Sequence, residues 1–279
     1  MAELKALSGQ HQIGFIVIDG YHFDERYQRD VKAIGPPLMT LDDYGHCQNY
    51  CADLILNQNP GASAYLYLHR DEHCRLLLGT DYVMLRAQFL QAPKRSHILS
   101  AQPEHFLISM GGADLENATE LVLQALLKAT GKYSSAVTIG LIVGAANSHL
   151  QKLQTYTTPN KDKGAIQIFQ NVTDMANLLN SCQVLISAGG TTVFEAAYLA
   201  LPNLVLQTAA NQNAVKEFGK MGAIHYLGDL TGASEPALAK TIEAYLLPEL
   251  LNASAAKAAK IIDGRGTERV IAAMEPLSP

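Results

Sequence analysis

The fold of this chain is constrained most by a predicted strand, glycine turn and helix that follow one another without interruption. Residues 183–187 are predicted to form a buried strand, because residues 184–186 are a continuous apolar run typical of parallel sheets covered on both faces. Gly189 and Gly190 then allow a tight turn and a close approach of the backbone to a ligand. A helix is predicted to begin at Thr191, so this stretch favours an α/β fold with a parallel sheet.

The first turn of that predicted helix has the features of an anion-binding site. Its unpaired N–H groups and the positive end of its dipole face the glycine turn. Glu195 lies about one helical turn beyond Thr191 and faces the same side. The stretch therefore predicts a pocket for a phosphorylated ligand with a hydroxyl-rich portion. A plainer interpretation stays open, in which threonine caps the helix and Glu195 is a solvated acid that complements the dipole.

Strand-like and helix-like segments alternate along the whole chain, which is the pattern of α/β proteins with parallel sheets. In such folds, ligand-binding residues lie at the carboxyl ends of the strands. The predicted strands are residues 14–19, 38–41, 52–56, 76–85, 106–109, 136–143, 166–169, 183–187, 203–207 and 224–227. The predicted helices include residues 24–34, 118–127, 214–221, 235–247 and 252–262.

The length of 279 residues suits two domains, and a polar, proline-containing stretch at residues 91–96 suggests the boundary between them. We therefore expect a partial N-terminal domain over residues 1–95 and a second domain over residues 96–279. The first domain is short for its type, since the chain enters almost directly into a strand that normally has parallel neighbours on both sides. An exposed strand edge there would favour self-association.

Composition excludes several classes of protein. The net charge is −5 and the chain has no cluster of basic residues, which argues against nucleic acid as a partner. No apolar run has the length of a signal peptide core or a membrane span, so we expect a soluble, cytoplasmic protein. The four cysteines fit a reducing compartment and match no common zinc spacing, so no metal site is expected; they are Cys47, Cys51, Cys74 and Cys182.

Polar residues that follow the early strands are further candidates for a site. Tyr21 follows the first predicted strand and suits either a ligand contact or packing at the domain edge. Asp42 and Asp43 follow the second, but neighbours on an extended strand point in opposite directions, so one orienting carboxylate is favoured over a paired site. His46 and His22 are alternative candidates for a base. The turn at Gly111 and Gly112, with Asp114, suits either a ligand loop or a tight turn with a helix cap.

An ordered set of motifs runs from about residue 14 to about residue 228. The motifs are Ile18-Asp19-Gly20-Tyr21, Leu41-Asp42-Asp43, Cys51-Ala-Asp-Leu-Ile-Leu-Asn57-Gln-Asn59, Leu77-Leu-Gly79-x-x-Tyr82-x-x-Leu85-Arg86-x-x-Phe89, Ser109-Met-Gly-Gly-Ala-Asp114, and Val172-Thr-Asp-Met with Ser187-Ala-Gly-Gly-Thr-Thr-Val-Phe-Glu195, Leu201-Pro202 and Asn211-Gln212. The whole set resembles the PseG/SpsG family of UDP-sugar hydrolases, and its later part resembles the nucleotide-sugar domain of MurG-like glycosyltransferases.

The resemblance implies a GT-B-like fold in which two Rossmann-like domains close over a UDP-sugar, with no cofactor and no metal. It places the Val172 backbone and Met175 beside uracil, and Glu195 at the ribose hydroxyls. The implied diphosphate-binding residues are Gly189, Gly190, Thr191 and Thr192, and Asn211 and Gln212 lie near the junction of sugar and phosphate. Tyr21, Gly111 and Gly112 line the sugar side.

The sequence departs from the family at the catalytic base. PseG proteins carry a histidine in a Gly-x-Gly-His-x-x-Arg loop, and no such motif occurs here, since Gly45-His46 lacks the first glycine and has Asn49 in place of arginine. We expect that the segment is lost by truncation, a misplaced start codon or divergence, which leaves Tyr21, Asp43 and Asn211 as catalytic candidates. A UDP-sugar hydrolase of weak or absent activity is favoured; the alternatives are a glycosyltransferase and a non-catalytic UDP-sugar-binding half-enzyme.

Overall fold

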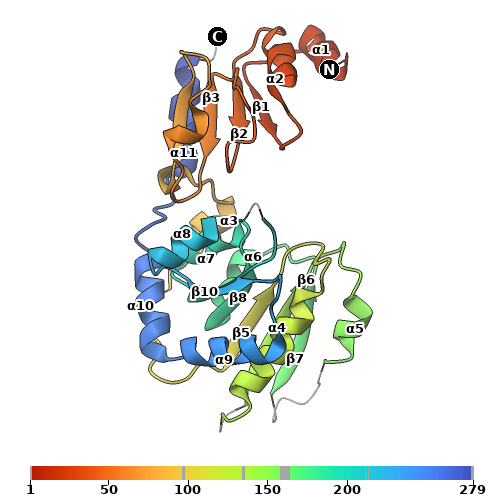
Figure 1. Ribbon diagram of the computed structural model, residues 1–279, viewed down its shortest axis with the longest axis vertical. Helices are drawn as coiled ribbons and strands as arrows, with labels where there is room; N and C mark the ends of the chain where they lie inside the picture. Colours follow the sequence, from red (N-terminus) through yellow and green to blue (C-terminus); the bar gives the residue numbers. More distant parts are fainter. Residues whose placement is uncertain are drawn as a thin grey trace. The chain divides into compact units, whose positions relative to one another are not determined.

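The computed structural model describes residues 2–95, 98–133, 136–157, 164–210, 212 and 214–277. The chain forms two compact units (Figure 1): the first consists of Met1–Leu85 and Asp263–Pro279, and the second of Arg86–Ile262. The first break falls after Leu85, where the sequence suggested a boundary after residue 95, and the end of the chain belongs to the first unit. Each unit contains one parallel sheet with helices, as expected for two Rossmann-like halves.

The first unit contains a four-stranded parallel sheet in the order β1-β2-β3-β4. Its elements are α1 (Ala2–Gln10), β1 (Ile16–Asp19), α2 (Glu25–Lys32), β2 (Leu38–Leu41), β3 (Leu54–Asn57), η1 (Ala64–Tyr67), β4 (Arg75–Leu78), η2 (Thr80–Tyr82), α11 (Gly266–Met274) and η4 (Glu275–Leu277). The strand predicted over residues 76–85 ends early, because Gly79 has a φ of 94° and turns the chain into η2.

Strand β1 differs from the buried strand that the sequence predicts. Its pairing partner among the described strands is β2, so it lies at an edge of the sheet. Its residues alternate between buried and exposed, and Val17 is 49% exposed while Ile16 and Ile18 belong to the core. The run of apolar residues did not reveal this alternation, because Val17 is as apolar as its buried neighbours.

Helix α11 covers one face of the first sheet and was not among the predicted helices. Val270 and Ala273 pack in one cluster with strand residues that include Leu54 and Leu56. The helix begins where Gly266 lies so close to Val83 that a Cβ atom would be 2.1 Å from its carbonyl oxygen. Covering the sheet with the last helix explains why the C-terminal segment belongs to the first unit.

The second unit contains a six-stranded parallel sheet in the order β10-β9-β8-β5-β6-β7. Its strands are β5 (His105–Ser109), β6 (Thr138–Val143), β7 (Ala165–Gln170), β8 (Val184–Ala188), β9 (Asn203–Gln207) and β10 (His225–Asp229). Its helices are α3 (Ala87–Gln91), α4 (Ala118–Thr130), α5 (Leu150–Gln154), α6 (Met175–Asn180), α7 (Thr192–Tyr198), α8 (Ala214–Lys220), α9 (Glu235–Tyr245) and α10 (Pro248–Ala258).

The core of the second unit confirms the pattern seen in the sequence. All five residues of β8 are buried, as expected for a central strand covered on both faces. Helices α4 and α9 pack together and share one cluster with alternate residues of the strands, including Ile108 and Ile186 (Figure 1). Helix α7 packs against β8 and β9. The strand, glycine turn and helix at residues 183–198 therefore form the centre of this unit.

Candidate functional site

The strand order of the second sheet reverses between β5 and β8, which makes this point a topological switch. From β5 the chain proceeds through β6 and β7 in one direction, and it then continues at β8 on the opposite side of β5. Ser109 and Ser187 are register partners at the carboxyl ends of these two strands. The Gly111-Gly112 and Gly189-Gly190 loops therefore leave the sheet side by side, at the position where open α/β sheets bind ligands.

The two glycines after β8 have different surroundings. A Cβ atom at Gly189 would lie 2.2 Å from Cγ2 of Val215, so only glycine fits there. A Cβ atom at Gly190 would meet nothing within 4 Å, and Gly190 and Thr191 are exposed. Thr192 begins α7, a helix of seven residues. One glycine thus lets the turn pack against α8, while the other leaves an open backbone surface for a ligand.

Gln212 holds the glycine turn in place. Its Oε1 atom accepts hydrogen bonds from the backbone N–H groups of Gly189, at 3.2 Å, and Thr208, at 2.9 Å. Its Nε2 atom donates to Oγ1 of Thr208 at 3.2 Å. The carboxamide thus joins the loop after β8 to the loop after β9. Asn211, the other residue predicted near the sugar–phosphate junction, lies outside the described residues.

The loop after β5 combines an exposed turn with a helix cap. Gly111 has a φ of 92°, and both Gly111 and Gly112 are exposed. The backbone of Gly112 lies against Gly144, where a Cβ atom would be 2.1 Å from the Gly112 carbonyl oxygen. Asp114 is buried, and its carboxylate accepts hydrogen bonds from the first N–H groups of α4, Ala118 N at 2.7 Å among them. Asn117 is the N-cap residue of α4, so Asp114 binds the first N–H groups of the helix from three residues before the cap.

Glu195 forms an ion pair that the sequence did not predict. Its side chain is 7% exposed, and its Oε1 atom accepts a hydrogen bond from Nε of Arg86 at 2.8 Å. Burial raises the pKa of Glu195, and Arg86 opposes that rise. Arg86 belongs to one of the motifs that carry the family resemblance, and its place in that motif is the signal that could have identified it.

The segment predicted to lie beside uracil begins α6. Val172 and Met175 are both half-buried. Asp174 caps the helix by accepting from the N–H group of Asn177 at 3.0 Å. The preceding N–H group, that of Ala176, donates to Oε1 of Gln88 in α3 at 3.1 Å. Helix α3 is therefore hydrogen-bonded to the start of α6. Arg86, the residue immediately before α3, pairs with Glu195 in α7.

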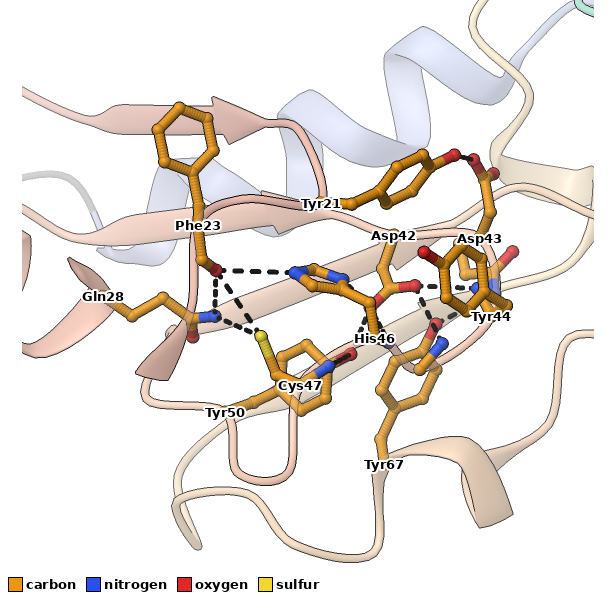
Figure 2. Close-up of polar contacts among 12 residues, drawn as sticks. Tyr21, Phe23, Gln28, Asp42, Asp43, Tyr44, His46, Cys47, Tyr50 and Tyr67 are labelled. Carbon is orange, nitrogen blue, oxygen red and sulfur yellow. Dashed lines mark hydrogen bonds and ion pairs between the residues drawn. The ribbon is translucent and has the colours of Figure 1, made fainter. Parts of the chain in front are cut away.

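In the first unit, Asp42 is the centre of a buried hydrogen-bond network (Figure 2). Its carboxylate accepts from the N–H groups of Tyr44, at 2.7 Å, and Gly45, at 2.8 Å, from Nδ1 of His46 at 2.9 Å, and from the hydroxyl of Tyr50. Burial alone would raise the pKa of Asp42, but the bonds from Tyr50 and the two N–H groups outweigh it, so the pKa is lowered. Asp42 thus organises the loop after β2.

Asp43 points to a different set of partners from Asp42, as the alternation of an extended chain predicts. Its Oδ2 atom accepts a hydrogen bond from the hydroxyl of Tyr21 (Figure 2), and its Oδ1 atom accepts from Nδ2 of Asn59 at 2.6 Å. These residues follow β1, β2 and β3, three neighbouring parallel strands. The structure therefore brings two of the catalytic candidates together, Tyr21 and Asp43, and adds Asn59.

The two histidines considered as substitute bases are engaged in local contacts. His46 has Nδ1 on Asp42 and Nε2 3.4 Å from the carbonyl oxygen of Phe23, so both ring nitrogens face acceptors (Figure 2). The ring of His22 lies against the ring of Phe23, with centroids 3.9 Å apart. Their surroundings favour structural roles for both.

Among the described residues, no group of three or more histidine, cysteine, aspartate and glutamate side chains is arranged to hold a metal ion. No described helix combines the length and apolar character needed to cross a membrane.

No protein-family model matches the chain, but individual proteins do. It is 26% identical over 205 residues to the spore coat polysaccharide biosynthesis protein SpsG of Bacillus subtilis, which covers 73% of this chain and 59% of SpsG. It is 24% identical over 212 residues to the pseudaminic acid cytidylyltransferase and UDP-2,4-diacetamido-2,4,6-trideoxy-beta-L-altropyranose hydrolase of Helicobacter pylori, covering 75% of this chain and 37% of that protein. The chain thus spans between 37% and 59% of the length of these two relatives.

Solved structures share the fold over nearly the whole chain. MurG of Acinetobacter baumannii matches with a TM-score of 0.64 at 16% identity, covering 99% of this chain and 77% of MurG. The UDP-GlcNAc 2-epimerase of Methanocaldococcus jannaschii, solved with UDP-GlcNAc and UDP, matches with a TM-score of 0.62 at 13% identity, covering 99% and 79%. These matches confirm the predicted fold and resemblance: the chain is a GT-B-like protein related to the PseG/SpsG family.

Proposed function

We propose that this chain is a UDP-sugar hydrolase-like protein that releases UDP from a nucleotide-linked amino-deoxy sugar in surface-glycan biosynthesis of the pseudaminic acid type. The observation that carries the proposal is the pairing of two glycine loops at the switch point of the second sheet, with the buried carboxylate of Glu195 in the adjoining helix. The hydrolase named in the Helicobacter pylori relative supports the reaction class.

In this proposal the second unit binds UDP. The exposed backbone at Gly190 and Thr191 receives the diphosphate, because N–H groups at a turn before a helix stabilise anions. Glu195 accepts hydrogen bonds from the ribose hydroxyls, and Val172 and Met175 lie beside uracil. Gln212 acts through the backbone that it holds, since its carboxamide already bonds to the two loops.

The proposed reaction is displacement of UDP by water. The water oxygen bonds to the anomeric carbon, the bond from that carbon to the β-phosphate oxygen breaks, and UDP leaves with the electron pair. N–H groups that face the diphosphate lower the energy of the leaving group. In the first unit, Tyr21 and Asp43 are the candidates for handling the proton of the water, because their hydrogen bond already joins a donor to a carboxylate. We expect slow turnover, since the family's histidine motif is absent from the sequence.

Binding and product analysis test this function together. Calorimetry with UDP should give a measurable Kd, and the Glu195→Gln variant should have a higher Kd because its affinity for UDP is lower. Failure of UDP to bind would refute the proposal. Incubation with a panel of UDP-sugars then decides the reaction. Free sugar with UDP indicates a hydrolase, UDP release that depends on an added acceptor indicates a glycosyltransferase, and binding without release indicates a non-catalytic UDP-sugar-binding protein.

A further inference from the structure

We propose that Arg86 is a positioning residue for nucleotide binding, whose ion pair with Glu195 holds that carboxylate oriented toward the ribose. This inference rests on the proposed function, because it concerns the same UDP-binding site in the second unit. Arg86 stands in the motif Leu85-Arg86-x-x-Phe89, one of those that carry the family resemblance.

Only one oxygen of the Glu195 carboxylate is used by the ion pair with Arg86. Nε of Arg86 donates to Oε1 of Glu195 at 2.8 Å, and Oε2 has no hydrogen-bond partner among the described residues. A buried carboxylate with one oxygen fixed by a guanidinium keeps the other oriented to accept from a ligand. Ribose hydroxyls supply such donors.

The side chain of Arg86 is 51% exposed and contacts an aromatic ring of its own helix. Arg86 is the N-cap residue of α3, and its guanidinium lies over the ring of Phe89, with Cζ 5.1 Å from the ring centroid. Phe89 is fully buried, and its ring face gives the guanidinium a favourable cation–π contact. In the same short helix, Gln88 accepts from Ala176 N at the start of α6. Helix α3 thus contacts both segments proposed to bind the nucleoside, α6 and α7.

The charge of Arg86 matters because Glu195 is buried. Burial favours the neutral carboxyl, which accepts hydrogen bonds from ribose hydroxyls more weakly than the ionised carboxylate does. Arg86 is the only charged group among the described residues that opposes this effect through a hydrogen bond or Coulomb attraction. Replacing the guanidinium with a neutral group should therefore make nucleotide binding depend on pH.

The test compares Arg86→Gln, which removes the charge, with Arg86→Lys, which keeps it. Calorimetry measures UDP and 2′-deoxy-UDP binding at several pH values, with each affinity divided by that of the wild type to cancel the titration of the phosphate. Arg86→Gln should weaken UDP binding about five- to tenfold, with the largest loss at the lowest pH, because loss of the guanidinium removes the group that lowers the pKa of Glu195. It should also reduce the preference for UDP over 2′-deoxy-UDP. Arg86→Lys should stay close to the wild type at each pH.

A matched control and three outcomes make the test decisive. Arg29→Ala breaks an exposed Arg–Glu pair of the first unit and should leave UDP binding unchanged. Tighter UDP binding by Arg86→Gln would overturn the inference, because Arg86 would then block the site. An equal loss for both nucleotides at every pH would also overturn it and leave only a structural role. If Glu195→Gln keeps the full preference for UDP, the ribose assignment of the proposed function fails instead.

Discussion

We expect alanine substitutions at the two glycines after β8 to have different effects: one should lower the stability of the protein, and the other should weaken ligand binding. In Gly189→Ala, the new methyl group would lie 2.2 Å from Cγ2 of Val215 and 3.0 Å from Cβ of Gln212. Carbon atoms in contact are normally about 3.5–4.0 Å apart, so Val215 or the turn must move by more than about 1 Å. Val215 is fully buried in α8, which leaves it little freedom to move.

The expected cost follows from these contacts. Overpacking of a buried site destabilises the folded protein by about 1–3 kcal/mol. Alanine also lowers the conformational entropy of the unfolded chain, which stabilises the protein by about 0.4–1 kcal/mol. The net loss for Gly189→Ala is therefore about 1–2 kcal/mol, which corresponds to a Tm lower by about 2–8 °C. Gly190→Ala meets nothing within 4 Å and has no positive φ, so its Tm should equal or slightly exceed that of the wild type.

The order of effects reverses for ligand binding. Gly190→Ala places a methyl group on the exposed surface where the diphosphate is proposed to approach, so the Kd for UDP should rise about tenfold, or about 1.4 kcal/mol. Thermal unfolding and calorimetry on both variants measure the two effects. A Gly190→Ala protein that binds UDP as tightly as the wild type would refute the close approach of a ligand to this turn. An unchanged Tm for Gly189→Ala would refute the packing argument.

Three other perturbations have defined expected results. Asp42→Ala should lower the free energy of unfolding by about 3 kcal/mol, because buried hydrogen-bond donors, including the hydroxyl of Tyr50, lose their acceptor. Since the folded-state pKa of Asp42 is lowered, its stabilisation is complete above the unfolded value, and the difference from wild type should shrink as pH falls below about 4 in acid unfolding curves. Gln212→Ala removes the acceptor for Gly189 and Thr208, so urea unfolding should show a loss of about 1–2 kcal/mol together with weaker UDP binding. Chelation by EDTA should leave the Kd for UDP unchanged, and a large change would contradict a metal-free site.

Local sequence patterns predicted most of the second unit. The apolar run at β8, the glycines after it and the alternation of strands and helices indicated a parallel α/β sheet, because such patterns depend on the period and burial of single elements. The same local logic predicted that Asp42 and Asp43 would face different partners, as they do. The family motifs, read in order, indicated a GT-B-like fold related to PseG and SpsG.

Tertiary structure alone decided which distant residues meet. The return of α11 to the first sheet joins Val270 to Leu54, and no local pattern specifies which sheet an amphipathic helix covers. The ion pair of Arg86 with Glu195 spans 109 residues, and its two members are individually ordinary charged residues. The edge position of β1 depends on which strands pair, and not on its own apolar content. The sequence thus determined the helices and strands and the strand ends that carry polar residues. Packing between these elements determined the partners of Glu195, of Asp43 and of the glycine turn.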